Sequence, residues 1–261
     1  MLDTNAINAA LTGTIFAGKL HHLRTTGSTN IDAVAAGRAG APHGSVWIAD
    51  EQTAGRGRSD HEWLSTAGEG LYVSVLLRLG IPPARLLLLP LASGLAAAQS
   101  VCTAAGLEAD LRWPNDLLIG PRKIAGILAE AASGFAVVGI GINVHQQSFP
   151  DGLATPATSL DLETGKRISR QAVLVELLKA LAREAEALAN LALAIEIPDR
   201  VARMSTWITG RNVEVHGPQA CTGTTAGLDE HGFLRVETAK GIFTVQTGGI
   251  RAASPDSSTM E

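Results

Sequence analysis

The stretch LYVSVLLRLGIPPARLLLLPLASGLAAAQSVCTAAGLEADLRW, residues 71–113, decides the fold of this 261-residue chain. Residues 71–79 are rich in residues that favour strands, and residues 82–105 are expected to form a long helix. Residues 109–113 are expected to form a second strand, which stops at Pro114. Strands and helices that follow one another in this way are typical of an α/β fold, so we expect a mixed sheet with helices packed on it.

The helical part of this stretch raises the question of a membrane span. Residues 86–107 carry no charge over 22 residues, a length that could cross a bilayer. However, the second half of the segment consists of weakly apolar residues, mainly Ala, Ser, Gln, Thr and Gly. The composition therefore favours a buried core helix and no membrane association.

The flanking segments extend the same pattern. We expect helices at residues 6–13, at residues 28–38 with Ser28 as a cap, and at residues 170–193. The last of these carries a leucine stripe formed by Leu174, Leu177, Leu178, Leu181, Leu188 and Leu191. The expected strands are residues 19–25, 45–50, 123–130 and 135–143.

The character of the chain changes after Ile208. Residues 211–249 contain the short alternating runs NVEVH, FLRVET and IFTVQT, separated by turn sequences. This spacing predicts a small SH3-like β-barrel. We therefore predict a catalytic domain at residues 1–208, a barrel at residues 209–251 and a disordered tail at residues 252–261.

Composition narrows the function classes. Hydrophobic residues make up 46% of the chain and charged residues 18%, which is enough for a large core. The net charge is −4 and no basic run occurs, which argues against nucleic-acid binding. The two cysteines, Cys102 and Cys221, lie far apart, so we expect neither a disulfide nor a metal site. No secretory signal is recognisable, and a cytoplasmic location is expected.

Glycine and arginine alternate in TAGRGRSDHEW, residues 53–63. Glycines let a backbone pass close to a ligand, and arginine offers a fork of donors to a carboxylate or phosphate. The motif indicates a loop that wraps an anion. A solvated surface turn is the alternative.

Two further motifs offer polar groups beside strands. In RWPND, residues 112–116, Pro114 ends a strand and exposes Asn115 and Asp116 at its edge, where α/β proteins bind ligands. Asn can recognise an amide or base edge, and Asp can hold Mg²⁺, although an ordinary turn explains the pattern equally. In RKIAGILAE, Lys123 precedes an apolar strand and could neutralise a carboxylate and a phosphate together. A solvated lysine at a strand end is the alternative.

Small polar residues open the second helix, in TTGSTN, residues 25–30. Ser28, Thr29 and Asn30 could satisfy a polar, uncharged group such as a urea, or they could simply cap the helix. In VVGIGINV, residues 137–144, glycines would let a ligand approach a buried strand. This motif is not a dinucleotide fingerprint, because the third glycine and the following helix are missing.

The order and spacing of these motifs resemble those of bacterial biotin protein ligases, also called biotin–[acetyl-CoA-carboxylase] ligases. The resemblance is strong over residues 25–143 and looser to about residue 251. It implies activation of biotin with MgATP to biotinoyl-5′-AMP, followed by transfer of biotin to a lysine of a biotin carboxyl carrier protein, the subunit of acetyl-CoA carboxylase. No nucleophilic side chain of the ligase is needed, because the acceptor lysine belongs to the carrier.

The resemblance also implies roles by motif position. Arg58 and Lys123 would be the catalytic residues, and Asp116 would bind Mg²⁺. The residues implied to bind biotin are Ser28, Thr29, Asn30, Gln52, Arg56, Gly57, Arg58 and Lys123. The residues implied to bind ATP are Gly55, Trp63, Asn115, Asp116, Lys123 and Asn143.

The chain departs from the family pattern in the loop. The family usually writes GRGR-x-G-R-x-W, whereas Asp60 and His61 replace the second Gly and third Arg here. Added carboxylates and a missing arginine predict weaker or more pH-sensitive retention of the adenylate. A protonated His61 could partly replace the absent arginine. Arg112 also stands where the family has lysine, which keeps the charge but not the shape.

Some family members carry an N-terminal DNA-binding domain. Only about 24 residues precede the TTGSTN motif, so we expect a form without that domain and without DNA binding. A homodimer could form by pairing of exposed sheet edges. Two rival functions stay open: a lipoyl or octanoyl ligase or transferase, which shares the catalytic fold, and a non-enzymatic biotin sensor with a decayed loop.

Overall fold

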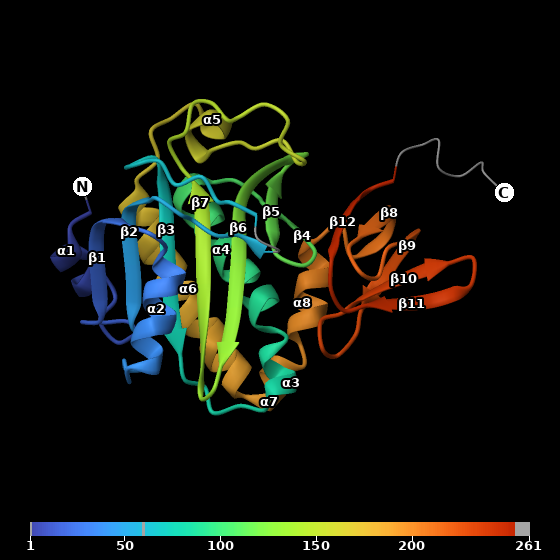
Figure 1. Cartoon of the computed structure of the whole chain (residues 1–261), viewed down its shortest axis with the longest axis horizontal. Coiled ribbons are helices and arrows are strands. Elements are labelled where there is room, and N and C mark those ends of the chain that lie inside the picture. Colours follow the sequence, from blue (N-terminus) through green and yellow to red (C-terminus); the bar gives the residue numbers. More distant parts are fainter. Residues whose placement is uncertain (1, 59–60, 254–261) are drawn as a thin grey trace.

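The computed structural model describes residues 2–58 and 61–253 (Figure 1). It has a seven-stranded mixed sheet covered by helices and, after it in the chain, a five-stranded antiparallel sheet. The predicted α/β fold class is therefore confirmed. Most of the predicted C-terminal tail, residues 254–261, lies outside the described residues, as do Ser59 and Asp60 of the glycine-arginine loop.

The elements follow one another in the order shown by the colours of Figure 1. The helices are α1 (Thr4–Ala10), α2 (Thr29–Arg38), α3 (Pro83–Leu86), α4 (Leu89–Ala105), α5 (Leu160–Thr164), α6 (Arg170–Ala189), α7 (Leu191–Ala194) and α8 (Ile197–Met204). The strands of the large sheet are β1 (Leu20–Thr26), β2 (Val46–Gln52), β3 (Gly70–Leu77), β4 (Asp110–Arg112), β5 (Asp116–Ile119), β6 (Arg122–Ala132) and β7 (Phe135–Asn143). Those of the small sheet are β8 (Thr209–His216), β9 (Cys221–Leu228), β10 (Leu234–Thr238), β11 (Gly241–Val245) and β12 (Gly249–Ala252).

The large sheet has the strand order β1-β2-β3-β7-β6-β5-β4. Strands β1 and β2 are parallel, and each of the other neighbouring pairs is antiparallel. Helix α2 packs on β2, β3 and β7, while α4 and α6 pack against each other on the opposite face, as Figure 1 shows. The sheet is thus buried on both faces along β3, which explains why residues 71–77 read as a continuous apolar run.

The apolar stretch forms the core as predicted. Among residues 2–58 and 61–253, the segment Pro83–Ala105, which comprises α3, the turn after it and α4, is the one helical segment long and apolar enough to cross a membrane, and 67% of its most apolar window is buried in the fold. The leucine stripe of α6 faces α4, and its residues up to Leu188 are buried. Leu191 is an exception to the predicted stripe, because α6 ends at Ala189 and Leu191, in α7, is 61% exposed.

One element differs from the sequence prediction in a way that matters for the site. Pro114 was expected to leave Asn115 and Asp116 at an exposed strand end. Instead the chain turns back, and β5 runs antiparallel to β4 with Arg112 paired to Asp116. The return strand forms because Leu117 and Leu118 are fully buried. Asp116 therefore lies between β4 and β6 within the sheet.

The small sheet follows α8 and has the order β11-β10-β9-β8-β12. Its strand β8 begins at Thr209, beside the predicted domain boundary at residue 208, which stays a prediction. Two hydrogen bonds tie this sheet to the large one. Trp113 Nε1 donates to the Gly232 carbonyl at 3.0 Å, and Arg58 Nη1 donates to the Gly248 carbonyl at 3.0 Å.

Candidate active site

A cavity of about 660 Å³ opens over β3, β6 and β7, between the glycine-arginine loop and the small sheet. It gathers residues that are far apart in the sequence. Every predicted site residue except Gly55 lines it: Ser28, Thr29, Asn30, Gln52, Arg56, Gly57, Arg58, Trp63, Asn115, Asp116, Lys123 and Asn143. The proximity is observed, whereas the individual roles stay predictions.

At the α2 end of the cavity, the lining is a neutral hydrogen-bond network. The backbone N–H and the hydroxyl of Thr29 lie 2.9 and 3.0 Å from Gln52 Oε1. Ser74 Oγ donates to Asn30 Oδ1 at 2.9 Å and lies 2.8 Å from Thr29 Oγ1. Thr29, Asn30 and Ser74 are all buried. These groups are therefore held in place for a polar, uncharged ligand group.

Ser28, Ser74 and Glu130, at this end of the cavity, differ from what the sequence predicted. Ser28 occupies the N-cap position of α2 but its side chain makes no cap hydrogen bond; the N–H of the next residue, Thr29, donates to Gln52 Oε1. The predicted capping by the Ser28 side chain is therefore wrong. Sequence reasoning missed Ser74 and Glu130. Ser74 is the lone polar residue within the apolar strand β3, which was its available signal. Asn30 Nδ2 donates to the Glu130 carboxylate.

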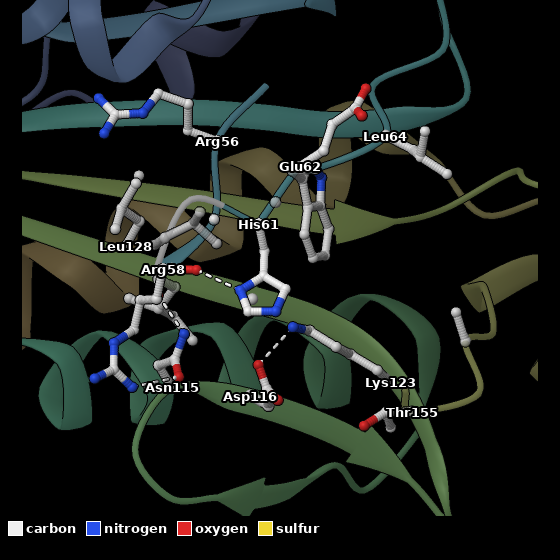
Figure 2. Close-up of a pocket in the computed structure, with 18 of the residues that line it drawn as sticks. Arg56, Arg58, His61, Glu62, Leu64, Asn115, Asp116, Lys123, Leu128 and Thr155 are labelled. Carbon is white, nitrogen blue, oxygen red and sulfur yellow. Dashed lines mark hydrogen bonds and ion pairs between the residues drawn. The ribbon is translucent and has the colours of Figure 1, made fainter. Parts of the chain in front are cut away.

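At the β5 end, the lining is ionic. Asp116 Oδ1 lies 2.6 Å from Lys123 Nζ, and Asp116 Oδ2 lies 2.6 Å from Arg112 Nη2. Burial opposes ionisation of Asp116 and is the largest single effect, but the two cations outweigh it and hold the pKa of Asp116 below its ordinary value. Two cations against one carboxylate leave a net positive charge, which suits the binding of an anion. Figure 2 shows Lys123 directed at Asp116 across the cavity floor.

This arrangement bears on the predicted magnesium ligand. Both carboxylate oxygens of Asp116 are engaged by Lys123 and Arg112. Within residues 2–58 and 61–253, no cluster of three or more His, Cys, Asp or Glu residues could hold a metal ion. Magnesium is usually held through one or two carboxylates and substrate phosphates. The residues present therefore do not form a protein magnesium site in this arrangement, and the role of Asp116 as a ligand stays a prediction.

The glycines of the cavity make room for an indole. A Cβ added at Gly141 would lie 2.3 Å from Trp63 Cε2, and one added at Gly126 would lie 2.9 Å from Trp63 Cζ3. Trp63 thus lies directly on the paired backbones of β6 and β7, and Lys123 Nζ is 5.3 Å from its ring centroid. Gly55 lies outside the cavity lining, and its predicted ATP contact stays a prediction; a Cβ added at Gly55 would lie 2.3 Å from the Trp63 carbonyl oxygen. This glycine allows the loop to pack on itself.

The two arginines of the loop extend in different directions, as Figure 2 shows. Arg56 Nη1 lies 3.8 Å from Glu130 Oε1, and its side chain is 43% exposed. Arg58 Nη1 donates to Asn115 Oδ1 at 3.3 Å and to the Gly248 carbonyl at 3.0 Å. Burial lowers the pKa of Arg58 and the charge of Asp116 opposes the shift, yet a guanidinium stays charged at neutral pH. Arg58 is therefore tied to the small sheet here.

Of the residues that depart from the family pattern, His61 and Glu62 are described. Both line the cavity. His61 Nδ1 lies 2.8 Å from the Arg58 carbonyl oxygen, and Gly57 N–H donates to the His61 carbonyl at 2.7 Å. His61 thus closes the turn of the loop. The predicted charge compensation by His61 stays a prediction, and Asp60 lies outside the described residues.

Comparison with known proteins now identifies the family. The model of the biotin/lipoate A/B protein ligase family matches residues 27–147. The biotin–[acetyl-CoA-carboxylase] ligase of Mycobacterium tuberculosis is 37% identical over 235 residues, which cover 86% of this chain and 85% of that protein. The chain belongs to the biotin/lipoate A/B protein ligase family. The matched residues 27–147 contain most of the cavity lining, including Arg58 and Lys123.

Other relatives agree with the assignment. A bifunctional ligase/repressor BirA of Bacillus spizizenii is 35% identical over 218 residues; the match spans 80% of this chain and 66% of that protein. The biotin protein ligase of Aquifex aeolicus, solved with biotin and ATP, superposes with a TM-score of 0.80 at 31% identity, over 90% of this chain and 100% of that one. The chain thus spans about two thirds of the Bacillus relative and the whole of the Aquifex chain.

Proposed function

We propose that this protein is a biotin protein ligase that joins biotin to ATP and then transfers it to a carrier protein. The single observation that carries the proposal is the cavity itself. It combines a buried neutral network at Thr29, Asn30 and Ser74 with a cationic end at Lys123 and Arg112. The ureido ring of biotin is polar and uncharged, whereas its carboxylate and the phosphates of ATP are anions, so the two ends of the cavity match the two kinds of group that the substrates carry.

The first step is activation of the carboxylate. A carboxylate oxygen of biotin attacks the α-phosphorus of ATP, the bond to the leaving pyrophosphate breaks, and biotinoyl-5′-AMP forms. Two anions must approach each other, so cations are needed to offset their repulsion and the charge that develops at phosphorus. Lys123 supplies one such cation at the cavity floor, and Arg58 supplies another once it leaves the Gly248 carbonyl. Magnesium is expected to arrive as MgATP.

The second step is transfer to the acceptor. The neutral amine of a carrier lysine attacks the acyl carbon, AMP leaves, and an amide remains. Because the acceptor supplies the nucleophile, the ligase must mainly hold the mixed anhydride and exclude water from it. We expect the loop at Arg56–Arg58, whose residues line the cavity, to perform that task.

A cysteine-dependent acyl transfer is less compatible with this cavity. Cys102 lies exposed on α4 and Cys221 is in β9 of the small sheet, and neither is among the described residues that line the cavity. The carrier is expected to be the biotin carboxyl carrier of acetyl-CoA carboxylase, the enzyme named for the Mycobacterium and Paracoccus relatives. A cytoplasmic location, the absence of DNA binding, and a dimer formed through an edge strand of the large sheet stay predictions.

The test is direct biotinylation. The purified protein is incubated with biotin, MgATP and a biotin carrier domain, and the intact mass of the carrier is followed. We expect a gain of one biotin, no gain when lipoate replaces biotin, and almost no gain with the Lys123→Ala variant over the time in which the wild type reacts to completion. Tight biotin binding without any mass gain would instead favour the biotin-sensor alternative.

A further inference from the structure

Gln146 carries an unpaired acceptor at the edge of the cavity. It follows β7, is 6% exposed and lines the cavity. Within the described part of the chain, its side-chain atom Oε1 is buried without a hydrogen-bond partner. Buried acceptors are nearly always satisfied in folded proteins, so an orphan beside a cavity indicates a donor on the ligand.

The orientation of the Gln146 amide follows from its neighbour. Asn143 Nδ2 donates to two backbone carbonyls, of Thr158 at 3.0 Å and of Lys123 at 3.4 Å. Those contacts fix the Asn143 amide, so its oxygen must face Gln146. Gln146 Nε2 accordingly donates to Asn143 Oδ1 at 3.4 Å. The nitrogen of Gln146 is thus committed to Asn143, and Oε1 is the atom left for a ligand.

Strand β7 shows how far Gln146 lies from the neutral network. Asn30 packs over Gly139, because a Cβ added there would lie 2.5 Å from Asn30 Oδ1. Trp63 packs over Gly141. Asn143, which holds Gln146, is four residues beyond Gly139 on the same strand, a distance of about 13 Å along an extended backbone. One polar head group cannot reach both ends, so Gln146 serves a different part of the bound ligands from Asn30.

Few groups of the proposed substrates can donate a hydrogen bond at that end. The phosphates of ATP are acceptors only, which leaves the ribose hydroxyls and the 6-amino group of adenine. The Trp63 indole, which lies over Gly126 and Gly141, offers a flat face between the two ends. A planar base can stack on that face and direct an exocyclic amine from its edge at Gln146 Oε1, which a ribose cannot do.

We propose that Gln146 Oε1 accepts a hydrogen bond from the adenine 6-amino group and so makes the site selective for adenine. The inference rests on the proposed function, since it takes ATP as the nucleotide. Gln146 is a specificity residue in this account: it contacts the base and takes no part in the transfer of the adenylyl group.

The experiment measures nucleotide binding by calorimetry in the full-length protein. The probes are ATP, purine riboside 5′-triphosphate, which has hydrogen in place of the amine, and 2′-deoxy-ATP. The test variant is Gln146→Met, which keeps the length of the side chain and removes the acceptor. The matched control is Gln147→Met, the same change at the next residue, which is exposed and outside the cavity lining.

We expect the wild type and Gln147→Met to bind ATP about fivefold more tightly than purine riboside triphosphate, as one neutral hydrogen bond would give. Gln146→Met should bind ATP and purine riboside triphosphate equally. Its relative affinity for ATP and 2′-deoxy-ATP, and its thermal unfolding temperature, should be the same as those of the wild type. The inference would be overturned if Gln146→Met still bound ATP about fivefold more tightly than purine riboside triphosphate. It would also be overturned if the variant lost only its preference for ATP over 2′-deoxy-ATP. Biotin-dependent adenylate formation, measured in parallel, separates the two proposals: adenine selectivity without adenylate would reject the ligase function alone.

Discussion

At the α2 end of the cavity, Thr29, Asn30 and Ser74 hold one another through neutral hydrogen bonds, whereas at the β5 end Asp116 is held between two cations. The two ends differ in what they can do. The neutral end can receive an uncharged polar group at little cost, because its hydroxyl and amide groups are held in fixed positions and can replace the hydrogen bonds that the group loses with water. The ionic end can attract an anion and stabilise developing charge.

The difference indicates that binding and activation are separable in this protein. Changes at the neutral end should alter the affinity for biotin, and changes at the ionic end should alter the rate of adenylate formation. Arg58 contacts Asn115 and the small sheet in this arrangement. Its guanidinium would assist activation once it leaves the Gly248 carbonyl, and the loop that carries it should also act on retention of the intermediate.

The largest effect should come from Lys123→Ala. Removing the cation that faces the reacting groups should lower biotin-dependent exchange of pyrophosphate into ATP by about 10²- to 10³-fold. The affinity for biotin, measured by calorimetry, should change much less. Lys179→Ala on α6, where the lysine pairs with Glu176 at 3.2 Å, is the matched control. An unchanged exchange rate with weakened biotin binding would reverse the assignment of the two ends.

Asp116→Asn should weaken the fold in a pH-dependent way. The pKa of Asp116 is held below its ordinary value, so its ion pairs stabilise the fold above the pKa of the unfolded chain and are lost as pH falls through the lower, folded-state pKa. We expect the variant to lose about 2 kcal/mol of unfolding free energy at pH 7, with a smaller difference from the wild type at pH 3. Urea unfolding measures both. Asp151→Asn, at an exposed residue, is the control.

A constant difference between Asp116→Asn and the wild type from pH 7 to pH 3 would contradict the ionic description of this end. At the neutral end, the difference in unfolding free energy between a variant and the wild type should not depend on pH in this way, because no titrating group lies within the contacts among Thr29, Gln52 and Ser74.

Thr29→Val should act on biotin affinity. The change keeps the shape of the side chain but removes the hydroxyl shared between Gln52 and Ser74. We expect about fivefold weaker biotin binding and a near-normal rate of adenylate formation at saturating biotin. Thr12→Val, at an exposed hydroxyl, is the control. A fall in the saturated rate with normal affinity would show that the neutral end takes part in activation.

The smallest effect is expected at His61. The His61 ring lies against the Arg58 carbonyl oxygen and closes the turn of the loop, so His61→Ala should release bound adenylate about two- to threefold faster than the wild type. Release is followed by filter binding of labelled adenylate. Identical release from the two proteins would show that His61 does not contribute to retention.

The sequence predicted the strands and the main helices well where apolar periodicity was strong, as in β3, β7 and α6. Helices α5 and α8 were not predicted, because each is short and its register depends on packing. The hairpin of β4 and β5 was also missed. A proline usually ends a strand, and the burial of Leu117 and Leu118 that brings the chain back is a tertiary effect.

The site was predictable as a set of motifs but not as a geometry. Twelve predicted residues line one cavity, yet no motif indicated that Arg58 would contact Gly248 or that both oxygens of Asp116 would be engaged. Ser74 and Gln146 were missed because a single polar residue in or after an apolar strand has no motif around it. Their roles depend on atoms brought together by β3 and β7.

We propose that one cavity holds biotin at its neutral end and the adenylate phosphate at its ionic end. The most direct measurement is a single-turnover reaction of the protein with biotin and MgATP in the absence of any carrier, followed by mass analysis of the bound small molecules. We expect about one equivalent of biotinoyl-5′-AMP to accumulate on the protein, and Lys123→Ala to form it about 10²- to 10³-fold more slowly, so that little is present when the wild type has completed its turnover. Unchanged biotin and ATP after saturation of both sites would contradict it.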